Sequence, residues 1–142
     1  MTLFGKRSSP ATKQVVDDAR PAKKITLRDL VPNDEKLYVA MQTFLLGDPK
    51  RQLPLLGTSD SLLIKGDEEK SRGENSMARF DYETAAKIEL YRMNRQAFEK
   101  FLRLANDIAV SGDRDKVFLE TLIANEDEAL RISKEYYREK ST

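Results

Sequence analysis

From Asp81 to the C-terminus, apolar residues recur every three or four positions, which is the spacing of one face of an α-helix. The longest series consists of Ala85, Ile88, Tyr91, Phe98, Phe101, Leu102, Ala105 and Ile108. Further aromatic side chains follow at Phe118, Tyr136 and Tyr137 and help to place the core. This pattern predicts that residues 81–140 are the strongest helical block of the chain.

Residues that favour helix ends divide this block. Asp81, Asp113 and Asn125 are each expected to begin a helix, because their short polar side chains cap free backbone N–H groups. Acidic residues after Asn125 and basic residues near the C-terminus suit the dipole of a last helix. Asn94 leaves open whether residues 81–110 form one helix or two.

A further helix is predicted over Asn33–Leu46, with Asn33 as its cap. Its apolar stripe consists of Leu37, Met41, Phe44 and Leu45. Gly47 and Pro49 are expected to end it, since glycine accepts the left-handed conformation and proline cannot continue a helix. A short turn is expected before it, over Thr26–Val31, with an apolar residue that packs back as a staple.

Residues 50–79 lack such periodicity. Two short apolar runs, at 53–56 and 62–64, flank the turn-forming sequence Gly57–Asp60, so a small hairpin is predicted, with Pro54 at an edge. From Lys65 to Ser76 the polar composition predicts a mobile surface loop. The expected fold is therefore all-α: a small bundle of about four to five helices with an irregular or hairpin segment at 50–79.

The sequence contains neither cysteine nor histidine. A disulfide scaffold and a thiolate zinc site are excluded, and the commonest general base is missing. Gly57–Lys65 does not match a phosphate-binding loop, and a calcium loop beginning at Asp113 fails where Val117 and Ala124 replace oxygen ligands. Carboxylate pairs such as Glu68 and Glu69 have ordinary explanations in solubility and capping. No enzymatic activity, cofactor or metal is therefore expected.

Charge is distributed unevenly along the chain. Residues 1–28 contain seven Lys or Arg and two Asp, a net charge of +5, whereas the whole chain carries +1, which leaves −4 for residues 29–142. Residues 1–25 are predicted to be a basic tail that is disordered or orders on a partner, and residues 26–142 a single helical domain. The partner-binding residues predicted in the tail are Leu3, Phe4, Lys6, Arg7, Lys13, Arg20, Lys23 and Lys24.

A second basic group is interleaved with aromatic residues in the helical block. Its members are Arg92, Arg95, Lys100 and Arg103, among Tyr91, Phe98 and Phe101. Basic and aromatic side chains in this mixture can bind single-stranded nucleic acid. An alternative is that Glu99 pairs with Arg95 or Arg103, four residues to either side, and that the aromatic rings belong to the core.

Together these features predict a non-enzymatic assembly subunit or adaptor that docks on protein subunits, its own copies or others. A viral or phage structural component is one form that such a protein takes. The alternative is a nucleic-acid-binding protein that acts through the basic tail. No apolar run is long enough to span a membrane, so an intracellular location is expected, in the cytoplasm or within a virion or other assembly. The sequence leaves the partner and the oligomeric state open.

Overall fold

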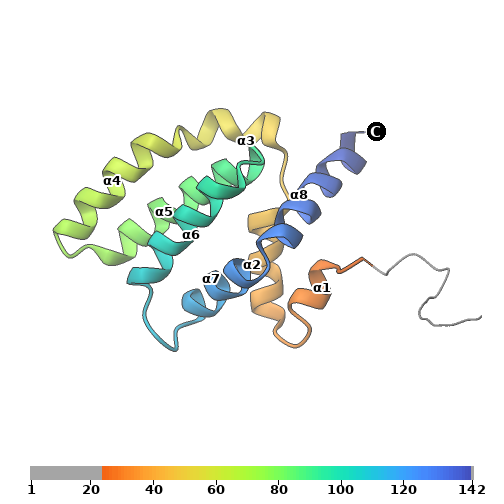
Figure 1. Ribbon diagram of the computed structural model, residues 1–142, viewed down its shortest axis with the longest axis horizontal. Coiled ribbons are helices and arrows are strands. Elements are labelled where there is room, and N and C mark those ends of the chain that lie inside the picture. Colours follow the sequence, from red (N-terminus) through yellow and green to blue (C-terminus); the bar gives the residue numbers. More distant parts are fainter. Residues whose placement is uncertain (1–23, 142) are drawn as a thin grey trace, which may run out of the picture.

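Three consecutive helices, labelled α4, α5 and α6 in Figure 1, lie side by side on one side of the molecule, and each runs antiparallel to the next. The computed structural model describes residues 24–141 and contains no strand within that range. Its helices are α1 (Leu27–Leu30), α2 (Glu35–Leu45), α3 (Pro49–Leu56), α4 (Ser59–Ser71), α5 (Asn75–Tyr91), α6 (Arg95–Ile108), α7 (Arg114–Ala124) and α8 (Glu126–Ser141). The all-α prediction is confirmed, but four to five helices was too few.

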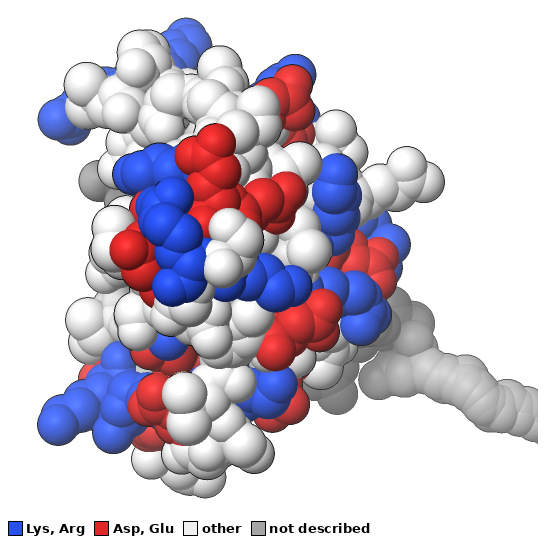
Figure 2. Space-filling view, turned by 90° about the vertical axis from the view of Figure 1, so that its left-hand side faces the viewer, with Lys and Arg blue, Asp and Glu red and all other residues white. Residues whose placement is uncertain are grey.

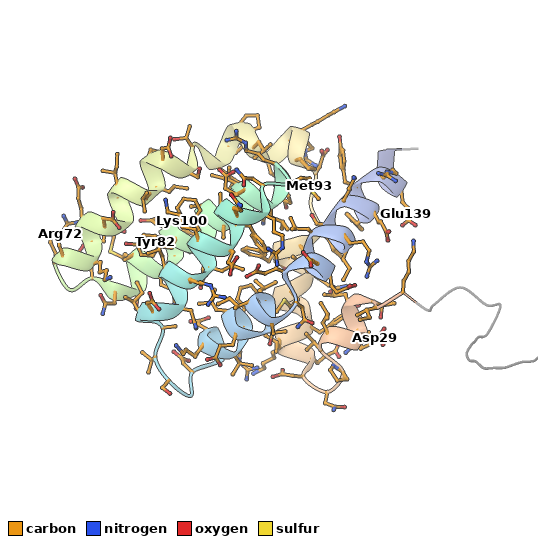
Figure 3. The ribbon with its side chains drawn as sticks, in the orientation of Figure 1. Asp29, Arg72, Tyr82, Met93, Lys100 and Glu139 are labelled. Atoms are coloured by element: carbon orange, nitrogen blue, oxygen red, sulfur yellow. The ribbon has the colours of Figure 1, made fainter. Side chains whose placement is uncertain are left out.

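Helix α5 is the centre of the fold. It packs between α4 and α6, and it also contacts α2, α3 and α8. Its inward face includes Tyr82, Ala85, Ala86 and Leu90, which are almost fully buried. Tyr82 lies inside the layer of α4, α5 and α6, whereas Arg72 lies at the outer turn between α4 and α5 (Figure 3). The predicted helical spacing around Ala85 is therefore confirmed.

The hairpin and mobile loop predicted at residues 50–79 are wrong. Pro49 does not merely follow the end of α2 but is the first residue of α3. Proline is tolerated there because the first turn of a helix does not use the N–H of that residue. The Asp48 side chain caps α3. Thr58 caps α4 by accepting a hydrogen bond from Ser61 N. Helix α4 carries polar residues on all sides, so it has no apolar stripe that a sequence pattern could reveal.

The predicted start of a helix at Asp81 is also wrong. Helix α5 begins at Asn75, without a side-chain cap, and Asp81 is a buried residue within it. Residues 81–110 form parts of two helices, because Met93 adopts a left-handed conformation and Asn94 caps α6. The caps predicted further on are confirmed in position: Asp113 caps α7, and Asn125 separates α7 from α8.

The predicted stripe of α2 is confirmed, since Leu37, Met41, Phe44 and Leu45 are buried. Its cap is Asp34 rather than Asn33, because the Asp34 carboxylate accepts a hydrogen bond from Leu37 N at 3.1 Å. Gly47 does not adopt the left-handed conformation that was expected. Its lack of a side chain instead leaves room for the Tyr91 hydroxyl. The short turn at Thr26–Val31 is confirmed as α1, with a capping box between Thr26 and Asp29.

None of the helices described here is both long and apolar enough to cross a lipid bilayer. The N-terminal segment predicted to be a basic tail lies, up to residue 23, outside the described residues. Lys24 is described, and its Nζ lies 3.2 Å from Oε2 of Glu135 on α8. The start of the described chain is thus held beside the last helix.

Candidate functional site

A hollow of about 450 Å³ lies between α2, α5 and α7 and is called here the α2–α5–α7 groove. Its volume falls within the range of ligand-binding pockets in proteins. Its apolar walls come from Leu37, Ala40, Phe44, Leu56, Phe80 and Phe118. Phe44 and Phe118 pack edge to face with ring centroids 5.4 Å apart, so one wall is a fixed aromatic pair.

Phe80 on α5 is the most informative residue of this region. It is 66% exposed, although a large aromatic ring usually lies in the core. Phe80 also lines a second hollow of about 260 Å³ between α4 and α5, together with Met77, which is half-exposed. The groove and this second hollow meet at Phe80, and the two together are called the Phe80 surface.

Phe80 is absent from the residues predicted from the sequence, because the helix was expected to begin only at Asp81. On a helix that begins at Asn75, Met77, Phe80 and Thr84 recur at helical spacing on one face. This face differs from the buried face that contains Ala85. A second apolar face on one helix is the signal that points to the surface.

Charged side chains at the rim of the groove pair with one another. Arg79 Nη2 lies 2.9 Å from Asp115 Oδ2, and Arg79 Nε lies 3.5 Å from Glu83 Oε2. Burial raises the pKa of Glu83 to about 7, although the Arg79 charge opposes this shift. Lys87 donates a hydrogen bond to the Thr43 carbonyl at 3.1 Å, and burial lowers the pKa of its ammonium group.

At one end of the groove, Arg114 binds both carboxylate oxygens of Asp34 at 3.1 Å. Asp34 also caps α2, and the hydrogen bond from Leu37 N is the main reason that its pKa is lowered. This pair ties α7 to the start of α2.

The second hollow has a carboxyl pair on its wall, formed by Glu69 of α4 and Asp81 of α5. Both residues are buried, and Lys65 Nζ is the nearest cation, 3.8 Å from Asp81 Oδ2. The hydrogen bond with Asp81, together with burial, raises the pKa of Glu69. Among the described residues, no group of three or more acidic side chains is arranged to hold a metal ion.

Other contacts between α4 and α5 are polar as well. Ser59 Oγ donates a hydrogen bond to buried Glu89 at 2.5 Å, and the Tyr82 hydroxyl donates one to Asp67. Gly66 allows this approach, because a Cβ atom there would lie 2.7 Å from the Tyr82 ring. Helix α4 is therefore held on α5 by polar contacts, in addition to Leu62 and Leu63, which pack against the core.

A third hollow, of about 630 Å³, lies between the start of α3 and α8. It is lined by Gly47, Asp48, Lys50, Arg51, Gln52, Tyr136 and Tyr137. Two of its polar groups have structural roles, since Asp48 caps α3 and Gln52 accepts a hydrogen bond from the Tyr91 hydroxyl at 2.7 Å. This hollow is polar and has no exposed apolar centre comparable to Phe80.

The predicted tail residues Leu3, Phe4, Lys6, Arg7, Lys13, Arg20 and Lys23 lie outside the described residues. Of the predicted tail, Lys24 and Ile25 are described. The Ile25 carbonyl accepts a hydrogen bond from Arg131, and Lys24 pairs with Glu135. Lys24 and Ile25 are thus both bound to residues of α8.

The predicted basic group is largely occupied by ion pairs. Arg95 Nε lies 2.6 Å from Asp127, and Arg103 Nη2 lies 2.9 Å from Glu99. The predicted pairing of Glu99 with the arginines on either side is confirmed. Tyr91, Phe98 and Phe101 are buried, as the core alternative expected. On the face shown in Figure 2, basic and acidic side chains are interspersed.

Comparison with protein-family models, curated protein sequences and solved structures finds no match to this chain. The function of the protein must therefore be inferred from its own residues. Among the hollows described above, the groove and the smaller hollow beside it combine concave shape with a large exposed aromatic side chain.

Proposed function

We propose that the chain is a non-enzymatic assembly subunit or adaptor, which binds an apolar segment of another protein across the Phe80 surface. The exposure of Phe80 between two hollows carries this proposal. Burial of a complete Phe side chain stabilises a complex by about 1.5–3 kcal/mol, and about two-thirds of Phe80 is still available for burial. A partner that fills the groove is stabilised by burial of Phe80 and also by burial of the apolar side chains that line the groove.

The shape of the site supports recognition of an amphipathic segment. A helix with apolar side chains on one face binds in this way to a hydrophobic groove. The charges at the rim already pair within the chain, as Arg79 does with Asp115 and Arg114 with Asp34. A partner therefore needs no charges of its own to match them, and apolar contact supplies most of the affinity.

The arrangement of side chains in the groove gives little support for catalysis. Catalytic side chains converge on the point where a substrate reacts. Glu83 and Lys87 line the groove, but Glu83 faces Arg79 and Lys87 is bound to the Thr43 carbonyl. The sequence has no histidine or cysteine to supply a further nucleophile or base. These observations favour binding over catalysis.

The test compares Phe80→Ser with Val39→Ser in the full chain. Val39 on α2 is also exposed, at 51%, but it does not line the groove. Wild type and each variant are immobilised on a resin and incubated with an extract of the source cells. Bound proteins are then identified by mass spectrometry. Self-association is measured separately by light scattering. We expect a defined protein, or a second copy, to bind wild type and Val39→Ser equally and to be lost from Phe80→Ser.

Two results would contradict the proposal. One is a strict monomer that retains no protein in any form. The other is a partner that binds Phe80→Ser as strongly as wild type, while circular dichroism shows that all three proteins are folded.

The charge of the N-terminal region favours a second function, nucleic-acid binding, because residues 1–28 carry a net charge of +5. Phosphate contacts by Lys and Arg supply most of such non-specific affinity. The basic residues of α6 support it less, since Arg95 and Arg103 are engaged in ion pairs. This function would therefore depend on the tail.

A further inference from the structure

The chain itself contains a segment whose chemistry matches the Phe80 surface. Leu3 and Phe4 are adjacent large apolar residues, and Lys6 and Arg7 follow after a glycine. Val15 and Val16 form the other large apolar pair of residues 1–23, but two aspartates follow them. Leu3–Arg7 is thus the part of the tail that combines apolar bulk with positive charge.

The groove suits such a segment in shape. Phe44, Phe80 and Phe118 give it aromatic walls, and a hollow of about 450 Å³ lies in the size range of drug-sized ligands. A Leu-Phe pair is an apolar group of that size. Apolar side chains of a docked segment would also cover the exposed ring of Phe80.

The charge of the surface next to the groove suits the cations that follow. Helix α4 carries Asp60, Asp67, Glu68 and Glu69 but only two basic residues, Lys65 and Lys70. Of these acidic residues, Asp60, Asp67 and Glu68 are exposed, and the hollow shared with Phe80 lies on the same side of α5 as α4. Residues 29–142 as a whole carry a net charge of −4, opposite in sign to the tail.

The length of the chain permits the contact. Residues 8–23 connect the segment to Lys24, which is held beside α8. Sixteen residues span up to about 55 Å when extended. Helix α1, which follows Lys24, packs on α2, and α2 provides Leu37 and Ala40 to the groove.

The strength of the contact decides which copy provides the segment. Two buried apolar side chains give a dissociation constant on the order of millimolar. Between separate molecules at micromolar concentration, such a segment stays unbound. Within one chain, the covalent connection gives an effective concentration that is also on the order of millimolar, so docked and free forms are comparably populated.

We propose that Leu3–Arg7 docks into the α2–α5–α7 groove of its own chain, as a weak internal ligand that a binding partner displaces. This inference rests on the proposed function, because both assign the groove to an apolar protein segment. It predicts that loss of the segment strengthens binding of the partner by about twofold, since the groove is then always available.

The experiment uses the absence of cysteine, which allows a single spin label in the full chain. Ser9→Cys carries a nitroxide, and its broadening of backbone amide signals is measured by NMR. We expect broadening at Phe80, Thr84 and Phe118, reduced at least twofold by Leu3→Ser with Phe4→Ser. The matched control, Val15→Ser with Val16→Ser, should keep the broadening of the parent. Unchanged broadening in the first variant, or none at the groove, would overturn the proposal.

A mixed sample separates the two sources of the segment. Isotope-labelled protein without nitroxide is combined with spin-labelled protein that lacks the isotope. If the mixed sample shows no broadening at the groove, the segment docks within its own chain, as proposed. If the broadening equals that of the directly labelled protein, a neighbouring copy provides the segment, and the proposal is overturned. If the tail variants change nothing but Phe80→Ser still loses its partner, this inference fails and the proposed function stands. If the partner binds Phe80→Ser normally, the proposed function fails.

Discussion

The carboxyl groups of Glu69 on α4 and Asp81 on α5 lie together in the wall of one hollow, and these residues are only 1% and 4% exposed. Among the described residues, no protein donor satisfies Glu69 Oε1 or Asp81 Oδ2. Two adjacent carboxyl groups in this position are stable when they share a proton, since two buried negative charges repel each other. A proton on Glu69 therefore favours the attachment of α4 to α5.

Glu69→Gln is expected to stabilise the protein at alkaline pH, because the amide donates to Asp81 without needing a proton. The raised pKa of Glu69 means that the wild-type fold loses stability as pH rises above the unfolded value of 4.5 and through the folded value. Urea unfolding at pH 5 and pH 8 measures this loss. Glu68→Gln, one residue earlier and exposed, should leave the pH dependence unchanged. Equal midpoints for wild type and Glu69→Gln at pH 8 would contradict the shared proton.

Glu83 gives a second pH dependence, from the rim of the groove. Its pKa rises from 4.5 to about 7 on folding, so the folded state binds the proton more tightly than the unfolded state. Its cost to stability is absent below pH 4.5, grows between pH 4.5 and 7, and is complete above pH 7. This pKa shift corresponds to a decrease of about 3 kcal/mol in the free energy of unfolding. Glu83→Gln should remove most of this slope, and an unchanged slope in urea titrations would show that Glu83 is not its source.

Gly66→Ala tests the close packing of α4 on α5. Alanine favours a helix over glycine by about 1 kcal/mol. At this position its Cβ would lie 2.7 Å from the Tyr82 ring, and overpacking of a core costs about 1–3 kcal/mol. We expect a net destabilisation of about 1 kcal/mol, seen as a lower urea midpoint. Lys70→Ala, on the exposed side of the same helix, is the control. A higher urea midpoint for Gly66→Ala than for wild type would mean that α4 shifts away from Tyr82 at little cost and that the close packing is not required.

The sequence predicted the helices whose apolar residues keep a single periodic stripe. In α2 and α6, Leu37, Met41, Phe98 and Phe101 are buried as their spacing indicated. Helix α4 could not be predicted in this way, because its buried residues, Ser59, Gly66 and Glu69, form no apolar stripe. Its buried polar residues looked like those of a loop, and their partners on α5 are distant in sequence.

The candidate site was missed for a related reason. Helix α5 uses one face for the core and exposes Phe80 and Met77 on another. A pattern that alternates between two apolar faces has no clear boundary, so the helix start was placed six residues too late, at Asp81 instead of Asn75. The groove itself needs α2 and α7 to approach α5, and no local pattern encodes that approach.

Nucleic-acid binding through the tail can be tested against binding through α6. Replacement of Lys6, Arg7 and Lys13 by Gln removes three charges from the tail. If these residues contact phosphates of a single strand, the slope of log affinity against log salt should decrease by about two, or about 0.7 per charge. Fluorescence anisotropy with an oligothymidine, over a series of salt concentrations, measures this slope.

The comparison variant replaces Lys100 and Arg103 of α6 by Gln. Arg103 already pairs with Glu99 at 2.9 Å, and Lys100 lies 5.5 Å from the centre of the Phe101 ring. We therefore expect this variant to keep the wild-type slope. A loss of slope in this variant alone would place the nucleic acid on α6 and exclude the tail. An absence of binding by wild type at low salt would exclude both sites, and leave protein binding at the Phe80 surface as the proposed function.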